Sequence, residues 1–251
     1  MRRSSQFPTS YDARVDRSAL FERARWAVLK AMTTAVVRSI VRLHVTGTEH
    51  VPPGPAILCF SHQSWTDPFI LAAAVPRGRR LRIYGPKEED MRVGVRNRLI
   101  RWSGAAVPFR PQKDDLLTNV RAVRALLRED SLLGIAGEGR IHAGEATLLP
   151  LEAGPAYLAL SSGVPLLPVA INGTGWITLG RVVRVRFGEP LEVEGRASRS
   201  AVEALTARTW ERLHELVQGY PEPAVPGRIG RWFTELFNDW PEGERPESRR
   251  L

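Results

Sequence analysis

Short apolar runs alternate with segments of helical periodicity through the middle of the chain. Each apolar run is bounded by proline, glycine or charged residues, which is the pattern of a buried strand. These runs predict strands at residues 43–48, 56–60, 81–84, 104–109, 132–136 and 165–171. Helical patterns lie between them at residues 69–74, 114–128, 155–161 and 201–217. The alternation predicts an α/β fold with a largely parallel or mixed central sheet flanked by helices.

Three further segments carry different kinds of side chain on their two sides. Residues 182–187 alternate apolar side chains with arginine, which predicts a half-exposed edge strand. Residues 18–43 predict a helix whose apolar face carries Leu29, Met32, Val36, Ile40 and Leu43 and whose basic face carries Arg23, Lys30, Arg38 and Arg42. Residues 228–240 predict a helix with an apolar stripe of Ile229, Trp232, Phe233, Leu236, Phe237 and Trp240.

The two terminal amphipathic helices either pack on the central domain or lie in a membrane interface, where basic residues and tryptophan are favoured. The chain therefore divides into a polar tail with a basic helix at 1–45, a central domain at 46–220, and a linker, aromatic helix and charged tail at 221–251. No stretch is long and uncharged enough to cross a bilayer. The residues after Met1 are polar and do not form a secretory signal.

The charge balance is strongly basic, with a formal net charge of +9 at pH 7. This balance predicts an anionic partner, which is a nucleic acid, a membrane surface or a phosphorylated substrate. Cys59 is the single cysteine, so an intramolecular disulfide is excluded and a reducing compartment fits the composition. Because Cys59 lies in an apolar run, we interpret it as a small core residue and not as a nucleophile.

A histidine and an aspartate follow the apolar run at 56–60. His62 and Asp67 stand five positions apart, and Pro68 after Asp67 indicates a helix start capped by Asp67. If the intervening turn folds back, Asp67 accepts a hydrogen bond from one ring nitrogen of His62, and the other nitrogen is left to accept a proton. That arrangement is the base and orienting carboxylate of a catalytic triad. Taken alone, such a pair is more often a structural or solvated histidine and a helix cap than a catalytic pair.

Polar residues at two other strand exits strengthen the catalytic interpretation. Parallel strands end at one edge of a sheet, where ligands bind in open α/β folds. Arg110, Glu138 and Arg140 follow predicted strands and would join His62 there, with the two arginines placed to hold a phosphate. The sequence contains no serine nucleophile elbow, no phosphate-binding loop and no cysteine–histidine spacing typical of a metal site. Asn172-Gly173-Thr174 indicates a turn and matches a glycosylation sequon, which has no meaning in a cytoplasmic protein.

These residues, in this order, resemble the sequence blocks of the glycerolipid acyltransferase family, whose best-known member is 1-acylglycerol-3-phosphate acyltransferase. His62 and Asp67 match the family's His-x4-Asp block. Gly104 and Arg110 match its second block, in which apolar residues separate a glycine from an arginine. Lys87 is similar to a lysine that the family carries before that block.

The third and fourth blocks of the family are also recognisable. The third reads Phe-Pro-Glu-Gly-Thr-Arg in the family, and here Glu138 and Gly139 are kept, the proline is lost and Arg140 comes one place early. The fourth is an apolar Val-Pro-x-x-Pro-Val run, which is present at residues 164–169. Each block is weak alone, but four in order across residues 46–220 are specific.

The resemblance implies a glycerol-3-phosphate acyltransferase-like fold and a transferase reaction. A fatty acyl group passes from acyl-CoA or acyl-carrier protein to the hydroxyl of a lysophospholipid, and 1-acylglycerol-3-phosphate would give phosphatidic acid. His62 would be the general base and Asp67 its orienting carboxylate. The substrate-binding residues would be Lys87, Gly104, Arg110, Glu138, Gly139 and Arg140. No cofactor or metal is implied beyond the acyl donor, which is a co-substrate.

The same resemblance predicts partners and a location. The expected partners are an anionic membrane surface, a lysophospholipid and the acyl donor, and the expected location is peripheral on the cytoplasmic face of the membrane. Nucleic acid is not expected, because the arginines are scattered over helix faces and do not cluster with exposed aromatic residues. Two alternatives stay open: an acceptor of another class, such as the lyso-form of an amino-acid-linked lipid, and a non-catalytic protein of the membrane surface.

Overall fold

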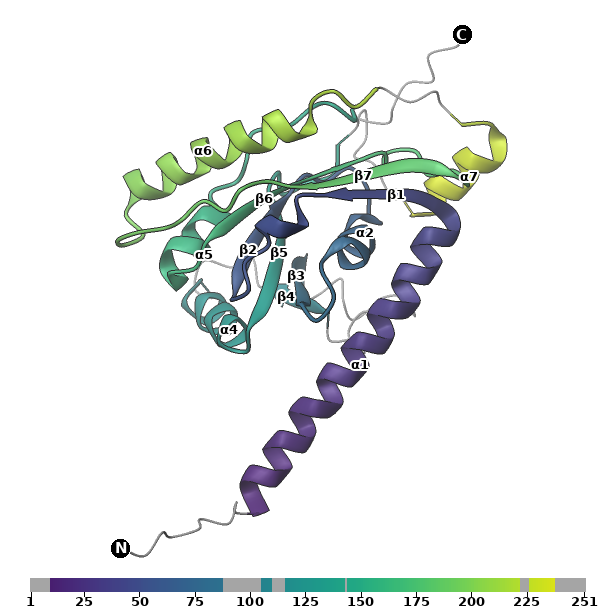
Figure 1. Ribbon diagram of the computed structural model, residues 1–251. Helices are drawn as coiled ribbons and strands as arrows, with labels where there is room; N and C mark the ends of the chain where they lie inside the picture. The colour runs from purple at the N-terminus through teal and green to yellow at the C-terminus, as the bar shows by residue number, and fades with distance from the viewer. Residues whose placement is uncertain (1–9, 88–104, 110–115, 143, 222–225, 238–251) are drawn as a thin grey trace, which may run out of the picture.

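Seven strands of one mixed sheet run through the described part of the chain, which in this computed structural model comprises residues 10–87, 105–109, 116–142, 144–221 and 226–237 (Figure 1). The strand order is β1-β7-β6-β2-β5-β3-β4. All neighbouring strands are parallel except β6 and β7, which confirms the predicted mixed α/β sheet. The strands are β1 (Val41–Thr46), β2 (Ala56–Phe60), β3 (Arg80–Lys87), β4 (Ala106–Phe109), β5 (Ser131–Ala136), β6 (Leu166–Asn172) and β7 (Arg181–Phe187).

Helices cover both faces of the sheet. One core lies between the sheet and helices α1 and α2, and a second lies between the sheet and helices α4, α5 and α6. In β2, Leu58 and Phe60 point into the first core, whereas Ile57 and Cys59 point into the second. A strand covered on both faces has no polar side to present, which is why its sequence is a continuous apolar run. The helices are α1 (Ser10–Ile40), the 3-10 helix η1 (Thr48–His50), α2 (Asp67–Ala74), α4 (Leu116–Arg128), α5 (Gly154–Ser162), α6 (Arg199–Val217) and α7 (Arg228–Phe237).

The parallel strands bring several loops to one edge of the sheet. Strands β2, β3, β5 and β6 run in the same direction, so their C-terminal ends lie together. The segments that leave β2, β5 and β6 at this edge begin with Ser61, Gly137 and Gly173, and Lys87 closes β3. β7 runs the opposite way and starts there with Arg181. The fold therefore gathers residues from distant parts of the sequence at the edge where the site was predicted.

One strand prediction needs correction. Residues 182–187 were expected to form an edge strand, but β7 lies between β1 and β6 and is paired on both sides. On this side of the sheet the outer strand is β1, which starts at Val41, two residues before the predicted start. Alternation reports that one face of a strand is exposed, and it carries no information about how many of its edges are paired.

Helix α1 also differs from the prediction. Lys30, expected on an outer basic face, points inward, where its amine donates to the carbonyls of Val75 at 2.6 Å and Pro76 at 2.7 Å. Burial, with a smaller contribution from Arg77, lowers the pKa of Lys30 to about 8. Met32 and Val36, which belong to the predicted apolar face, are 60% and 58% exposed. These two residues therefore do not follow the alternative in which the apolar face packs on the domain, and the membrane-interface alternative stays a prediction.

Helix α7 packs on the domain through a polar contact. The buried Thr234 hydroxyl accepts from the Ile177 amide at 3.0 Å and lies 3.1 Å from the Ile177 carbonyl. Ile229 and Trp232 of the predicted apolar stripe are 83% and 63% exposed. The side chains of Phe233, Leu236 and Phe237 and the whole of Trp240 lie outside the described residues. Within the described residues, no helix combines the length and the apolar character needed to cross a bilayer.

Candidate active site

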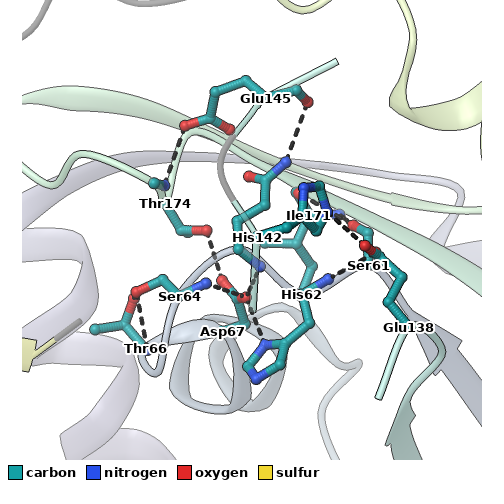
Figure 2. Close-up of polar contacts among 12 residues, drawn as sticks. Ser61, His62, Ser64, Thr66, Asp67, Glu138, His142, Glu145, Ile171 and Thr174 are labelled. Carbon is teal, nitrogen blue, oxygen red and sulfur yellow. Dashed lines mark hydrogen bonds and ion pairs between the residues drawn. The ribbon is translucent and has the colours of Figure 1, made fainter. Parts of the chain in front are cut away.

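His62 and Asp67 meet at the sheet edge, as the sequence predicted. His62 Nδ1 lies 2.9 Å from Asp67 Oδ2 (Figure 2). The His62 ring also packs edge-on against Phe60. A carboxylate only accepts hydrogen bonds, so Nδ1 carries the proton and Nε2 is left as an acceptor. The His62 side chain is 17% exposed and that of Asp67 is fully buried. The geometry thus gives an accessible imidazole that is oriented from behind by a carboxylate.

The turn between the two residues is closed by the aspartate itself. Asp67 Oδ2 also accepts the backbone amides of Gln63 and Ser64, both at 2.8 Å. Asp67 was expected to be the N-cap of the helix, but Thr66 occupies that position and Asp67 is the first residue of α2. Its carboxylate turns back over the loop and satisfies amides that precede the helix. The sequence spacing thus fixes the pair through local hydrogen bonds.

A hydroxyl from a distant strand completes the surroundings of Asp67. Thr174, which follows β6, donates to Asp67 Oδ1 at 2.5 Å. With the three donors on Oδ2, the buried carboxylate receives four hydrogen bonds. A buried charge needs such partners to offset the loss of its hydration. The network supports an ionised Asp67 behind the imidazole.

Glu138 reaches the site from β5 but faces inward. Its Oε1 accepts the His62 backbone amide at 3.2 Å, and its Oε2 lies 2.5 Å from His142 Nε2. The Glu138 side chain is fully buried and that of His142 is 3% exposed. These contacts tie the backbone of His62 to the turn after β5. The predicted substrate-binding role of Glu138 stays a prediction.

The other predicted site residues are placed to different extents. Gly139 has φ of 67°, a left-handed conformation that favours glycine, and Arg140 beside it is exposed at the same edge. Lys87 ends β3 opposite Phe109 of β4, and its side chain lies outside the described part of the structure. Gly104 and Arg110 lie outside the described residues altogether. Their roles therefore stay predictions.

Sequence reasoning missed three polar residues at this edge: Thr174, Glu145 and His142. Each is buried, at 0%, 3% and 2% exposure. They come from segments far from His62 in the sequence, so no local spacing indicates the contacts. The one available signal was the Asn172-Gly173 turn directly after a predicted strand, which placed Thr174 at the sheet edge.

Two other kinds of chemistry find no support in the described structure. Cys59 is fully buried, and burial followed by the nearby Glu138 raises the pKa of its thiol to about 12. A thiol with that pKa is not a nucleophile near neutral pH, which agrees with the prediction of a core cysteine. Among the described residues, no three histidine, cysteine, aspartate or glutamate side chains are grouped to hold a metal ion.

An apolar groove adjoins the histidine–aspartate pair. It has a volume of about 420 Å³ and runs between α1 and the start of α2. Trp65 and Phe69, whose ring centroids lie 5.2 Å apart, line one side, and Leu29 and Ile40 of α1 line the other. Thr66, which precedes Asp67, also lines the groove. The site thus combines a polar catalytic edge with an adjacent apolar surface.

Comparisons with known proteins agree with this geometry. The chain is similar in structure to the 1-acyl-sn-glycerophosphate (LPA) acyltransferase PlsC from Thermotoga maritima, with a TM-score of 0.60 and 20% identity over 83% of this chain and 84% of that one. At that identity the likeness shows the shared fold. No curated protein matches the chain by sequence.

The family comparison is more direct. The model of the family described as Acyltransferase matches residues 42–172, which is more than half of the chain. That segment contains His62 and Asp67 and ends where β6 ends. The chain belongs to the Acyltransferase family and is an acyltransferase enzyme.

Proposed function

We propose that the enzyme transfers a fatty acyl group from acyl-CoA or acyl-carrier protein to the hydroxyl of a lysophospholipid, with 1-acylglycerol-3-phosphate as the acceptor. The observation that carries the proposal is the His62 Nδ1–Asp67 Oδ2 contact of 2.9 Å at the edge where the parallel strands end. It leaves an oriented imidazole nitrogen available to deprotonate a hydroxyl, which is the chemistry that acyl transfer to an alcohol requires.

The proposed reaction needs no acyl-enzyme. His62 Nε2 takes the proton of the acceptor hydroxyl while the oxygen attacks the thioester carbonyl. The tetrahedral intermediate then expels the thiolate, and His62 returns the proton to the sulfur. The products are an ester and a free thiol. Asp67 stabilises the imidazolium that exists between the two proton transfers.

Basic residues at the same edge provide for the acceptor phosphate. Arg140 is exposed there, and Lys87 ends the neighbouring strand β3. Arg110 follows β4 in the sequence. A guanidinium holds a phosphate bidentately and so fixes the distance between the phosphate and the reacting hydroxyl. Because Arg140 stands one place earlier than the family's arginine, another lysolipid acceptor is the second candidate.

The apolar groove suits the hydrocarbon part of a lipid. Its lining by Leu29, Ile40, Trp65 and Phe69 offers a water-poor surface, and Thr66 places the groove beside Asp67. Burying one methylene group is worth about 0.8 kcal/mol, so a groove that holds several of them contributes substantially to binding. We therefore propose that an acyl chain lies in this groove while the polar end of the same substrate faces His62.

The exposed face of α1 supports a membrane-surface location. Val28, Met32 and Val36 stand one turn apart and are 59%, 60% and 58% exposed, and Met32 and Val36 also line the mouth of the apolar groove, whereas Lys30 points inward. An apolar stripe that faces outward fits a lipid interface better than water. Trp232 of α7 adds an exposed aromatic side chain. With the net charge of +9, these features support reversible binding to anionic membranes from the surface.

The acyl-transfer proposal is tested with purified protein, labelled acyl-CoA or acyl-carrier protein, and a panel of lysolipids, with the products identified by mass spectrometry. We expect labelled phosphatidic acid from 1-acylglycerol-3-phosphate and little product from lysolipids without a phosphate monoester. A product formed only from an amino-acid-linked lysolipid would identify the second candidate. No acylated lipid from any acceptor with either donor would refute the proposed reaction.

The membrane proposal gives a separate prediction. Wild-type protein should float with anionic vesicles at low salt and be released at high salt, because screening weakens headgroup attraction. Replacing Val28, Met32 and Val36 by serine should reduce vesicle binding by about tenfold or more, since three exposed apolar side chains no longer enter the interface. Because these side chains are largely exposed, the melting temperature should change little.

A control substitution separates this effect from a general surface effect. Ala204→Ser changes an exposed residue of α6, on the opposite face of the sheet from α1, without changing the net charge, and should leave flotation unaltered. Equal flotation of the triple variant and the wild type would show that α1 does not contact lipid. A marked fall in the melting temperature of the triple variant would show that the stripe packs within the protein.

A further inference from the structure

The tripeptide Asn172-Gly173-Thr174 has no part in the proton transfers described above, yet all of it is buried. Asn172 and Thr174 are both at 0% exposure. The tripeptide starts at the last residue of β6 at the catalytic edge, and β6 lies beside β2, which precedes His62. Buried polar side chains in a loop are costly unless they serve as hydrogen-bonding partners. The contacts of this loop therefore indicate its task.

Thr174 reaches the carboxylate that orients the base. Its hydroxyl donates to Asp67 Oδ1 at 2.5 Å (Figure 2). Asp67 Oδ2 accepts from His62 Nδ1 and from two backbone amides. Within the described part of the chain, Oδ1 takes its hydrogen bond from Thr174. The Thr174 hydroxyl thus fixes the rotation of the carboxylate about its own axis.

Glu145 holds the backbone on both sides of Thr174. Its Oε2 accepts the Gly173 amide and its Oε1 accepts the Gly175 amide at 3.1 Å. Arg181 at the start of β7 lies 3.6 Å from Oε1. Because the amides on both sides of Thr174 are bonded to one carboxylate, the backbone at Thr174 is held in place. The carboxylate of Glu145 therefore fixes the loop that positions the Thr174 hydroxyl.

The first two residues of the tripeptide fix where the loop begins. The Asn172 side chain donates to the carbonyls of Glu145 and, at 3.2 Å, Val217. Gly173 has φ of 94°, and a Cβ there would lie 2.5 Å from both the Tyr220 hydroxyl and the Val182 carbonyl. Only glycine fits this position. These contacts fix the conformation of the tripeptide and direct the buried Thr174 hydroxyl toward Asp67.

We propose that Thr174 is a positioning residue of the acyl transfer reaction, which holds the Asp67 carboxylate in the rotation that aims Oδ2 at His62 Nδ1, and that Glu145 holds Thr174 in place. The inference rests on the proposed function, because it assigns Thr174 a task toward the base. Thr174 is fully buried, so it acts on the transfer rate and does not contribute to acceptor binding. A loop residue 107 positions from Asp67 thereby becomes part of the catalytic arrangement.

The ionisation of Glu145 sets the conditions of the test. Burial raises the pKa of Glu145 to about 7, while the amides of Gly173 and Gly175 and the charge of Arg181 act in the opposite direction and Asp67 raises it slightly. Below that pH the carboxyl is protonated and becomes a poorer acceptor for the two amides. The comparison of variants is therefore made near pH 8, where the Glu145 carboxylate is ionised.

The test compares Thr174→Val, which removes the hydroxyl, with Thr174→Ser, which keeps it. We expect kcat to fall about tenfold in the valine variant, as loss of a hydrogen bond to a charged acceptor predicts. The acceptor KM should stay within about twofold, and serine should restore kcat. Thr209→Val is the matched control, because Thr209 is equally buried but bonds to its own helix at Leu205. If valine fails to fold, Thr174→Ala replaces it with the same expected loss.

Two kinetic outcomes would overturn the proposal. One is a kcat of the valine variant within about twofold of the wild type, which would make the hydroxyl irrelevant to the reaction. The other is an equal loss of kcat in the serine and valine variants, which would attribute the effect to packing of the methyl group. A loss in valine together with rescue by serine supports the proposal.

A spectroscopic measurement tests the same claim without an activity assay. In protein labelled with ¹⁵N at histidine, the His62 signals, identified by their absence in His62→Gln, report which ring nitrogen carries the proton. Because Asp67 stays a carboxylate in all three proteins, we expect the Nδ1–H tautomer in each of them. The ¹⁵N chemical shift of Nδ1, which reports the strength of its hydrogen bond, should change in Thr174→Val and return to the wild-type value in Thr174→Ser. An unchanged Nδ1 shift in the valine variant would overturn the inference. Activity that survives His62→Ala would instead refute the proposed base.

Discussion

Replacing His62 by alanine should lower kcat about 10²- to 10⁴-fold while leaving the protein folded. The reason is that His62 combines an orienting carboxylate with a partly exposed imidazole, whereas His142, which also lies against a carboxylate, is buried. The stability cost should be modest, because the His62 side chain is partly exposed and its main packing contact is the edge of Phe60. The measurement is single-turnover acyl transfer with saturating donor and acceptor, accompanied by a melting curve.

A second histidine provides the control for this substitution. His44 lies exposed on β1, which is three strands from β2 in the sheet, so His44→Ala should retain wild-type turnover and melting temperature. Near-normal turnover of folded His62→Ala protein would refute general-base catalysis by His62. A loss of turnover in His44→Ala as large as that in His62→Ala would show that the assay reports stability and not the chemistry.

The strands of the sheet centre were the part of the fold most readily predicted. β2 was predicted with its exact bounds, and β5 and β6 to within one residue at each end, because their residues are apolar without interruption. A strand covered by helices on both faces leaves that continuous signature, and its bounding prolines and glycines mark the ends. β1 and β7 are not buried continuously and lack that signature. This is why β1 was predicted two residues late and β7 was given the wrong place in the order.

Helix α1 shows what periodicity cannot decide. Residues 23–40 carry apolar side chains on more than one side, so the pattern predicts a helix but does not determine which side packs inward. The position of Lys30 is decided by the carbonyls of Val75 and Pro76, which follow the end of α2 and lie some 45 residues away in the chain. The two hydrogen bonds from the partly buried Lys30 amine to these carbonyls offset the cost of removing its charge from water. Such tertiary partners are invisible in a helical wheel.

The candidate site divides along the same line. His62 and Asp67 were predicted because their contact spans five residues and is closed by amides of the same turn. Thr174 and Glu145 were not predicted, because their contacts depend on β6 lying beside β2. That neighbour relation is a property of strand order, which the sequence pattern leaves open. Sequence spacing therefore predicts a contact within one turn, such as that of His62 with Asp67, but not a contact with a distant strand end, such as that of Asp67 with Thr174.

Exchanging Asp67 for asparagine should lower kcat about 10- to 100-fold, less than the loss of His62. At the Oδ2 position the new side chain faces three donors: the His62 Nδ1–H and the amides of Gln63 and Ser64. An amide nitrogen there would oppose donors, so the asparagine oxygen should occupy that position and its nitrogen should point to Thr174. The Thr174 hydroxyl can rotate to accept it. His62 would keep its tautomer, and only the negative charge that stabilises the imidazolium would be lost.

Combining Asp67→Asn with Thr174→Val should therefore be worse than the two losses multiplied together. Valine offers no acceptor, so the buried asparagine nitrogen is left unpaired and the amide gains by turning over, which places its nitrogen against His62 Nδ1. His62 would then shift its proton to Nε2 and cease to be a base for the acceptor. The measurement is kcat for both single variants and the double variant, with the ¹⁵N signals of His62 recorded for each. The contrary outcome is that Asp67→Asn alone already shows the Nε2–H tautomer and the activity of His62→Ala. That result would show that the backbone amides do not hold the asparagine oxygen in place, and that Thr174 does not determine the orientation of the amide.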